Sequence, residues 1–193
     1  MSSNALTTWR KDRHSRIDRL LTLHARVRGP GEEIEELNHA VVLRLASEFQ
    51  GFSRQLHTES LDFLKGRLLP GQPQFWTYLL VPYTKASILN TGNATAKALA
   101  EDFGLFGVLL WEKLRQTYPG QVDAWRRELN WLNKARNALA HEDYNQLVKL
   151  TADSVSIDDA RARKWKTVLD ELTEGIDRIV GDHFGIVFGV RPW

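Results

Sequence analysis

Apolar residues recur at three- and four-residue steps along most of the chain, which is the periodicity of amphipathic helices. The clearest stripe joins Ile34, Leu37, Val41, Leu45, Phe49, Phe52 and Leu56. It follows a run of glutamates between positions 32 and 36, and carboxylates favour the N-terminal end of a helix. A weaker stripe runs from Ala5 to Val27, before the helix-breaking Gly29-Pro30-Gly31. We expect a helix in each segment, the second reaching at least Leu61.

Four further helices are expected beyond the connecting loop at 66–74, which holds two prolines and two glycines. They span about 75–90, 95–118, 122–140 and 156–185, and the last begins with a Ser156-x-x-Asp159 capping box. No segment alternates β-branched and polar residues between hairpin turns. The pattern therefore predicts an all-α, antiparallel bundle of about five to six helices.

Length and composition fit a single globular domain over residues 1–193. Cysteine is absent, which excludes disulfides, thiolate metal sites and a cysteine nucleophile. The N-terminal residues lack the apolar core of a secretory signal, and no stretch has the length of apolar sequence that a membrane span needs. We therefore expect a cytoplasmic protein with no membrane partner.

The net charge of +2 hides a basic segment between Arg10 and Arg28, in which only Asp12 and Asp18 are acidic. Such a segment can attract a polyanion. It is more often a solvated helix face with internal ion pairs, and both interpretations stay open here.

The sequence contains none of the glycine-rich phosphate loops, serine elbows or paired-histidine zinc motifs of common enzymes. The consecutive residues His141, Glu142 and Asp143 point in different directions on a helix, so we expect no metal site and no cofactor. What remains is Arg136-Asn137-x3-His141 at the end of a predicted helix.

An arginine five positions before a histidine also occurs at Arg19/His24 and Arg178/His183. Apolar residues follow Arg19 and Arg178, so we expect those histidines to pack against the fold. Only Arg136 precedes a polar residue, Asn137.

Asn137 and His141 share one helix face, and Arg136 lies roughly 100° further round, toward the apolar stripe. A partly buried guanidinium needs a carboxylate partner. Glu48 is our candidate because it falls within the apolar stripe of an early helix, although Asn38 and Glu59 also fall near that stripe.

These features resemble the HEPN superfamily of helical nuclease-like domains. The resemblance spans most of the chain and rests on three features: the Arg136-Asn137-x3-His141 motif, the early helix from Leu37 to Phe52 with its inward acid, and the closing helix around Trp165.

The resemblance implies a metal-independent endoribonuclease, active as a homodimer, in a toxin–antitoxin or phage-defence setting. It implies that His141 transfers protons and Arg136 stabilises charge on the phosphate, with Asn137 and Glu48 in supporting roles. Attack by the RNA 2′-hydroxyl would leave a 2′,3′-cyclic phosphate and a 5′-hydroxyl. We expect the RNA backbone to bind Arg10, Arg13, Arg126, Arg127 and Lys134.

Some family toxins are modified by a partner antitoxin on a tyrosine two residues after the histidine. Here Tyr144 comes one position later, so this regulation is not implied. The alternative function is a catalytically inactive helical module that binds RNA or a protein, with His141 and Arg136 serving only the helix end. We expect Trp76, Trp111, Trp125 and Trp165 to pack in the core, and Trp131 to lie at a dimer interface or beside the substrate.

Overall fold

The computed structural model describes residues 1–27, 31–68, 70–71, 74–76, 78 and 87–193, and helices joined by turns, without a strand, make up this part of the chain. In chain order, the helices and helical turns are α1 (Asn4–Thr8), the π-helical turn η1 (Trp9–Arg13), α2 (His14–Arg26), α3 (Glu32–Leu68), the 3-10 turn η2 (Ile88–Asn90), α5 (Ala96–Gly104), α6 (Leu110–Thr117), α7 (Val122–Ala140), α8 (Tyr144–Ala152) and α9 (Asp159–Phe188). The prediction of an all-α helical bundle is confirmed.

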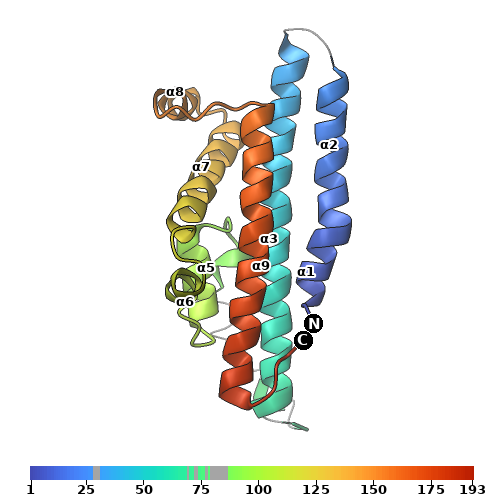
Figure 1. Cartoon of the computed structure of the whole chain (residues 1–193), viewed down its shortest axis with the longest axis vertical. Helices are drawn as coiled ribbons and strands as arrows, with labels where there is room; N and C mark the ends of the chain where they lie inside the picture. The colour runs from blue at the N-terminus through green and yellow to red at the C-terminus, as the bar shows by residue number, and fades with distance from the viewer. Residues whose placement is uncertain (28–30, 69, 72–73, 77, 79–86) are drawn as a thin grey trace.

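The long helices α3 and α9 lie side by side at the centre of the bundle and run in the same direction (Figure 1). The helix formed by α1, η1 and α2 covers one side of α3 in the opposite direction. On the other side, α5 and α7 pack against α3, and α6 packs against α9. The short helix α8 stands out from the bundle beyond the end of α7 (Figure 1). This arrangement places the C-terminal end of α7 on the surface.

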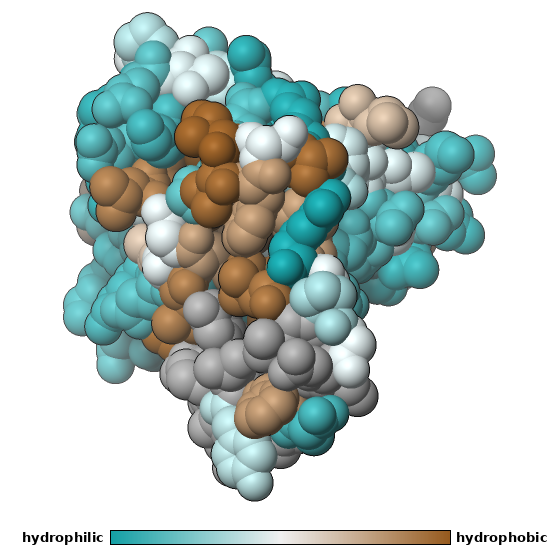
Figure 2. All heavy atoms as spheres, turned by 90° about the horizontal axis from the view of Figure 1, so that it is seen from below, coloured by the Kyte–Doolittle hydropathy of each residue, from teal (hydrophilic) through white to brown (hydrophobic). Residues whose placement is uncertain are grey.

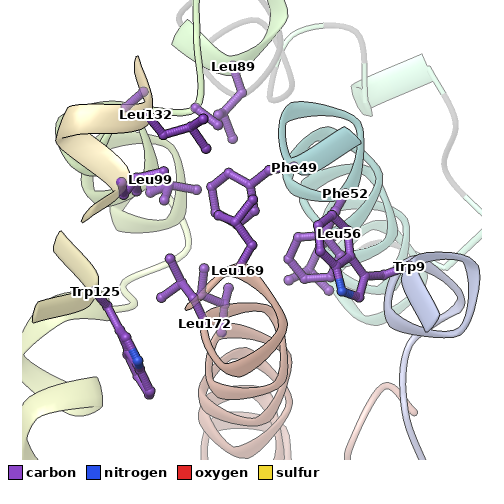
Figure 3. Packing of buried hydrophobic residues seen from close by; sticks show 14 of the residues in the cluster. Trp9, Phe49, Phe52, Leu56, Leu89, Leu99, Trp125, Leu132, Leu169 and Leu172 are labelled. Atoms are coloured by element: carbon purple, nitrogen blue, oxygen red, sulfur yellow. The ribbon is translucent and has the colours of Figure 1, made fainter. Parts of the chain in front are cut away.

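Aromatic and leucine side chains from the N-terminal helix, from the central pair α3 and α9, and from α5 and α7 meet in the core (Figure 3). The Trp9 indole packs edge-on against Phe49 and Phe52 of α3, with ring centroids 6.4 and 6.0 Å apart. Its Nε1 also donates to Asp170 Oδ1 of α9 at 3.0 Å. Because one indole contacts two helices, it sets the position of the N-terminal helix against both.

Two carboxylates hold the first turn of α1. Asp177 Oδ1 accepts a hydrogen bond from Ser3 N at 3.2 Å, and Glu59 Oε2 accepts one from Asn4 N at 2.9 Å. Burial raises the pKa of both carboxyl groups above their ordinary values, against the opposing effect of these hydrogen bonds. The N-terminus is therefore fastened to α3 and α9 by partly desolvated acids.

The predicted helix at 95–118 is in fact two helices. Gly107 has a φ of +79°, a left-handed conformation that glycine adopts without strain, and it ends the turn after α5. Trp111 Nε1 then donates to the Ala96 carbonyl at 2.8 Å, which folds α6 back onto α5. The apolar stripe continues through this break, so periodicity alone did not reveal it.

The predicted polar connection after α7 contains a helix, α8. The Asp143 side chain caps it by accepting from Gln146 N at 3.0 Å, and Leu150 is its one fully buried residue. With Leu150 as its one buried residue, α8 has too short an apolar stripe to be recognised in the sequence.

Several helix ends differ from their predicted positions. α3 continues through Gly66 to Leu68, and α9 passes Gly185 before ending at Gly189, whose φ is +70°. Asp158, not Ser156, caps α9 by accepting from Arg161 N at 2.7 Å. Most of the predicted helix at 75–90 and part of the predicted loop at 66–74 lie outside the described residues, and 88–90 form the 3-10 turn η2.

Trp111, Trp125 and Trp165 are buried, as the sequence predicted for them. Trp76 is only partly buried, so its predicted core position is wrong, and Trp131 is also partly buried. At the end of the bundle where α3 and α9 finish, apolar residues gather on the surface (Figure 2), with Ile186 83% and Val187 55% exposed. No helix in the described part of the chain has the length and apolar character needed to cross a membrane.

Candidate functional site

The outer face of α7 carries a stripe of cationic and amide side chains that ends at the predicted motif. Steps of three or four residues place successive residues about 4.5–6 Å apart along the helix axis, on one face. The inner face buries Leu129, Leu132 and Ala135 against the core. The exposed members of the stripe are Arg126, Asn130, Lys134, Asn137 and His141.

Arg136 lies between the two faces and is partly buried. Its Nη1 donates to Asn137 Oδ1 at 3.1 Å, and no carboxylate in the described residues forms an ion pair with it. The same Oδ1 accepts a second hydrogen bond, from Asn93 Nδ2 at 2.7 Å. The Asn137 amide oxygen therefore links the guanidinium to a segment outside α7.

That segment, residues 91–95, is fixed between α3 and α7. Asn133 Nδ2 donates to the Ala94 carbonyl at 3.2 Å, and the Gln50 side chain donates to the Gly92 carbonyl. Asn93 is thus a site residue that sequence reasoning missed. The only signal was the Asn90-Thr91-Gly92-Asn93 break, which indicates a turn and not its position.

His141 is the C-cap residue of α7 and is exposed. Asp143 N donates to the Ala138 carbonyl at 2.8 Å, closing a Schellman turn around Glu142, which has a φ of +52°. A glutamate in this left-handed conformation carries steric strain that a glycine avoids. The tight turn directs the chain away from His141 and leaves its imidazole open to solvent.

Glu48 is buried, as its position in the stripe predicted, but it does not pair with Arg136. Its carboxylate forms ion pairs with Arg13, Arg16 and Arg44 instead. The predicted Arg136–Glu48 partnership is therefore wrong, because Glu48 faces α2 and not α7.

The two other polar positions near that stripe also have partners elsewhere. Asn38 Oδ1 bonds His24 Nε2 at 2.8 Å, and Glu59 accepts from Asn4. Arg136 consequently keeps a positive charge that no acid in the described part of the chain neutralises.

The residues predicted to bind RNA fall into two groups. Arg10 forms a two-pronged pair with Glu174, and Arg13 is held by Glu48, so the charges of both are engaged internally. Arg126, Arg127 and Lys134 are exposed on α7 without a carboxylate partner among the described residues. The guanidinium groups of Arg126 and Arg127 lie over the Trp111 and Trp131 rings, at 5.4 and 5.6 Å from the centroids.

The other two Arg-x4-His pairs are structural, as predicted. His24 bonds Asn38, and the His183 ring lies 3.0 Å from the Phe106 carbonyl oxygen. In the described residues, no cluster of three His, Asp or Glu side chains has a geometry that would hold a metal ion. The accessible groups at the end of α7 are therefore a guanidinium, an amide and an imidazole, followed by the exposed carboxylates of Glu142 and Asp143.

Comparison with known proteins yields no relative: the chain matches no family model, and it has no significant similarity to a curated protein or a solved structure.

Proposed function

We propose that this protein is a metal-independent endoribonuclease whose site is the end of α7. The observation that carries the proposal is the Arg136 guanidinium. It is partly buried, oriented by Asn137, and faces no carboxylate in the described residues. A guanidinium held in this way offers a forked donor to an external anion such as a phosphodiester. The exposed His141 imidazole, one helical turn after Asn137, adds a group that can accept and donate a proton.

In the proposed reaction, the 2′-oxygen of a ribose attacks the adjacent phosphorus and the 5′-oxygen leaves. A base takes the 2′-hydroxyl proton, and an acid protonates the 5′-oxygen, giving a 2′,3′-cyclic phosphate and a 5′-hydroxyl. His141 performs one of these transfers, and His141 of a second copy performs the other in a homodimer. Arg136 contacts the non-bridging oxygens, where charge develops, and Asn137 keeps its guanidinium in place.

The exposed stripe on α7 supplies the substrate path. Arg126 and Lys134 are two four-residue steps apart on the face of α7 that leads to His141, and Arg127 lies beside Arg126. They attract the RNA backbone without reading its sequence, so binding weakens as salt concentration rises. The setting that we propose is a toxin or phage-defence effector in the cytoplasm, restrained by a cognate antitoxin or defence protein.

Incubation with end-labelled RNA in the presence of EDTA tests the proposal. We expect the parent protein to cleave, and the Arg136→Ala/His141→Ala variant to lose at least about 100-fold in rate, the scale of a missing charge-stabilising donor. The matched control is Arg178→Ala/His39→Ala, which removes the same residue types elsewhere. Equal cleavage by the parent and the Arg136→Ala/His141→Ala variant, or 3′-hydroxyl ends on the products, would contradict the proposed site or its chemistry.

A second candidate is an RNA-binding or interaction module without catalysis. It is favoured by one observation: in the described residues no side chain hydrogen bonds the His141 ring, so nothing within one chain selects its tautomer. Salt-sensitive RNA binding without cleavage by the parent protein would favour this function.

A further inference from the structure

A second group of guanidiniums surrounds the buried carboxylate of Glu48 between α2 and α3. Arg13 Nη1 donates to Oε2 at 2.9 Å. Arg16 Nη1 and Arg44 Nη1 donate to Oε1 at 3.3 and 3.2 Å. One negative charge is therefore shared by three permanent positive charges.

Arg13 alone suffices to neutralise Glu48. Its side chain is 15% exposed, it makes the shortest of these ion pairs, and it also donates to Gln55 Oε1 at 3.3 Å. Gly51 makes room for it, because a Cβ at that position would clash with Arg13 Nη1. The Arg13–Glu48 pair is thus the buried, balanced part of the cluster.

Arg16 and Arg44 are the surplus. Their side chains are 49% and 45% exposed, and both contact the same carboxylate oxygen, so two like charges are held close together at the surface. Within the described chain, neither pairs with any other acid, and exposed Asp12, one turn before Arg16, forms no ion pair with them. A doubly charged anion between the two groups would relieve their repulsion.

We propose that Arg16 and Arg44 form a phosphate-binding site, distinct from the end of α7. The buried Glu48 carboxylate, which is itself held by Arg13, keeps the two guanidiniums in place. The ligand is a phosphate group that lies between the exposed nitrogens of Arg16 and Arg44. The group belongs either to a nucleic-acid backbone or to a small phosphate compound. The site does not depend on Arg136 or His141, so it stands apart from the proposed ribonuclease activity.

Two probes distinguish these sources: a fluorescent oligouridylate carrying 2′-O-methyl groups, which cannot be cleaved by 2′-hydroxyl attack, and pyrophosphate. Binding is measured by anisotropy and calorimetry for the parent, Arg16→Gln and Arg44→Gln. The matched control is Lys164→Gln, because Lys164 is also a half-exposed cation, 54% exposed, on a buried glutamate, Glu128. All three substitutions remove one positive charge.

We expect each arginine substitution to weaken binding of at least one probe roughly tenfold, and Lys164→Gln to weaken it less than about twofold. Loss confined to the oligonucleotide assigns a backbone phosphate, and loss that includes pyrophosphate assigns a free phosphate compound. Equal loss in all three variants, or no binding of either probe, overturns the proposal.

Arg16→Lys and Arg44→Lys keep the positive charge but lose the forked guanidinium. They provide the readout if a glutamine variant unfolds, and we expect them to bind more weakly than the parent. Unchanged binding in both lysine variants together with a folded, unaffected glutamine variant would also overturn the site.

Discussion

Asn93 Nδ2 donates to Asn137 Oδ1 at 2.7 Å, joining residues 44 positions apart and tying the turn before α5 to the end of α7. The same oxygen also accepts a hydrogen bond from Arg136. The bond from Asn93 therefore helps to orient the Arg136 guanidinium, the group that we propose binds the phosphate.

We expect Asn93→Ala to reduce RNA cleavage about tenfold while lowering the free energy of unfolding by only about 1 kcal/mol, the usual value of one hydrogen bond. Cleavage rates and urea unfolding provide the two measurements. The control is Asn145→Ala, which removes an exposed amide from α8. A parallel fall of activity in both variants would show that the tether has no special role.

Glu48 should be far more important for stability than its partners on the surface. Glu48→Gln leaves the buried Arg13 guanidinium without a counter-charge, and breaking such a pair costs about 3–5 kcal/mol. Arg44→Gln keeps the Arg13–Glu48 pair and should cost less than about 1 kcal/mol. Denaturant unfolding of both variants checks this order, and the reverse order would refute the central role of Glu48.

Glu142→Gly should stabilise the protein. Glycine relieves the left-handed strain at a φ of +52° but adds freedom to the unfolded chain, so we expect a net gain of at most about 1 kcal/mol. Ser154, with a φ of +60° after α8, offers the same test in Ser154→Gly. Lower stability of both variants in urea titrations would argue that neither turn is strained.

Stability should depend on pH through Asp177. Burial raises the pKa of this carboxyl group in the folded state, so the folded protein holds the proton more tightly than the unfolded chain. Its contribution therefore favours folding below the ordinary pKa and is lost as the pH rises through the folded-state pKa.

Asp177→Asn removes this titration while its Oδ1 can still accept from Ser3 N. We expect the variant to be more stable than the parent at neutral pH. The difference in stability should shrink as the pH falls toward about 3.9, the ordinary pKa of Asp. Thermal unfolding across this range measures it. An advantage that grew on acidification would contradict the sign.

Much of the bundle was predictable because helix periodicity is local. The inward position of Glu48 and the shared face of Asn137 and His141 follow from counting residues along one helix. The break at Gly107 did not follow, since the apolar stripe continues through it. The helix α8 did not follow either, because its apolar stripe is too short. Local patterns therefore predicted the long helices better than the turns between them.

The sequence alone determined which side chains share a face of α7: a cationic and amide stripe outside, and leucines inside. The tertiary structure decided which groups meet across helices: Arg13 and not Arg136 at Glu48, and Asn93 at Asn137. The reason is physical. Spacing along a helix specifies the direction of a side chain about its own axis, but a partner on another helix depends on how the two are shifted and rotated when their cores pack.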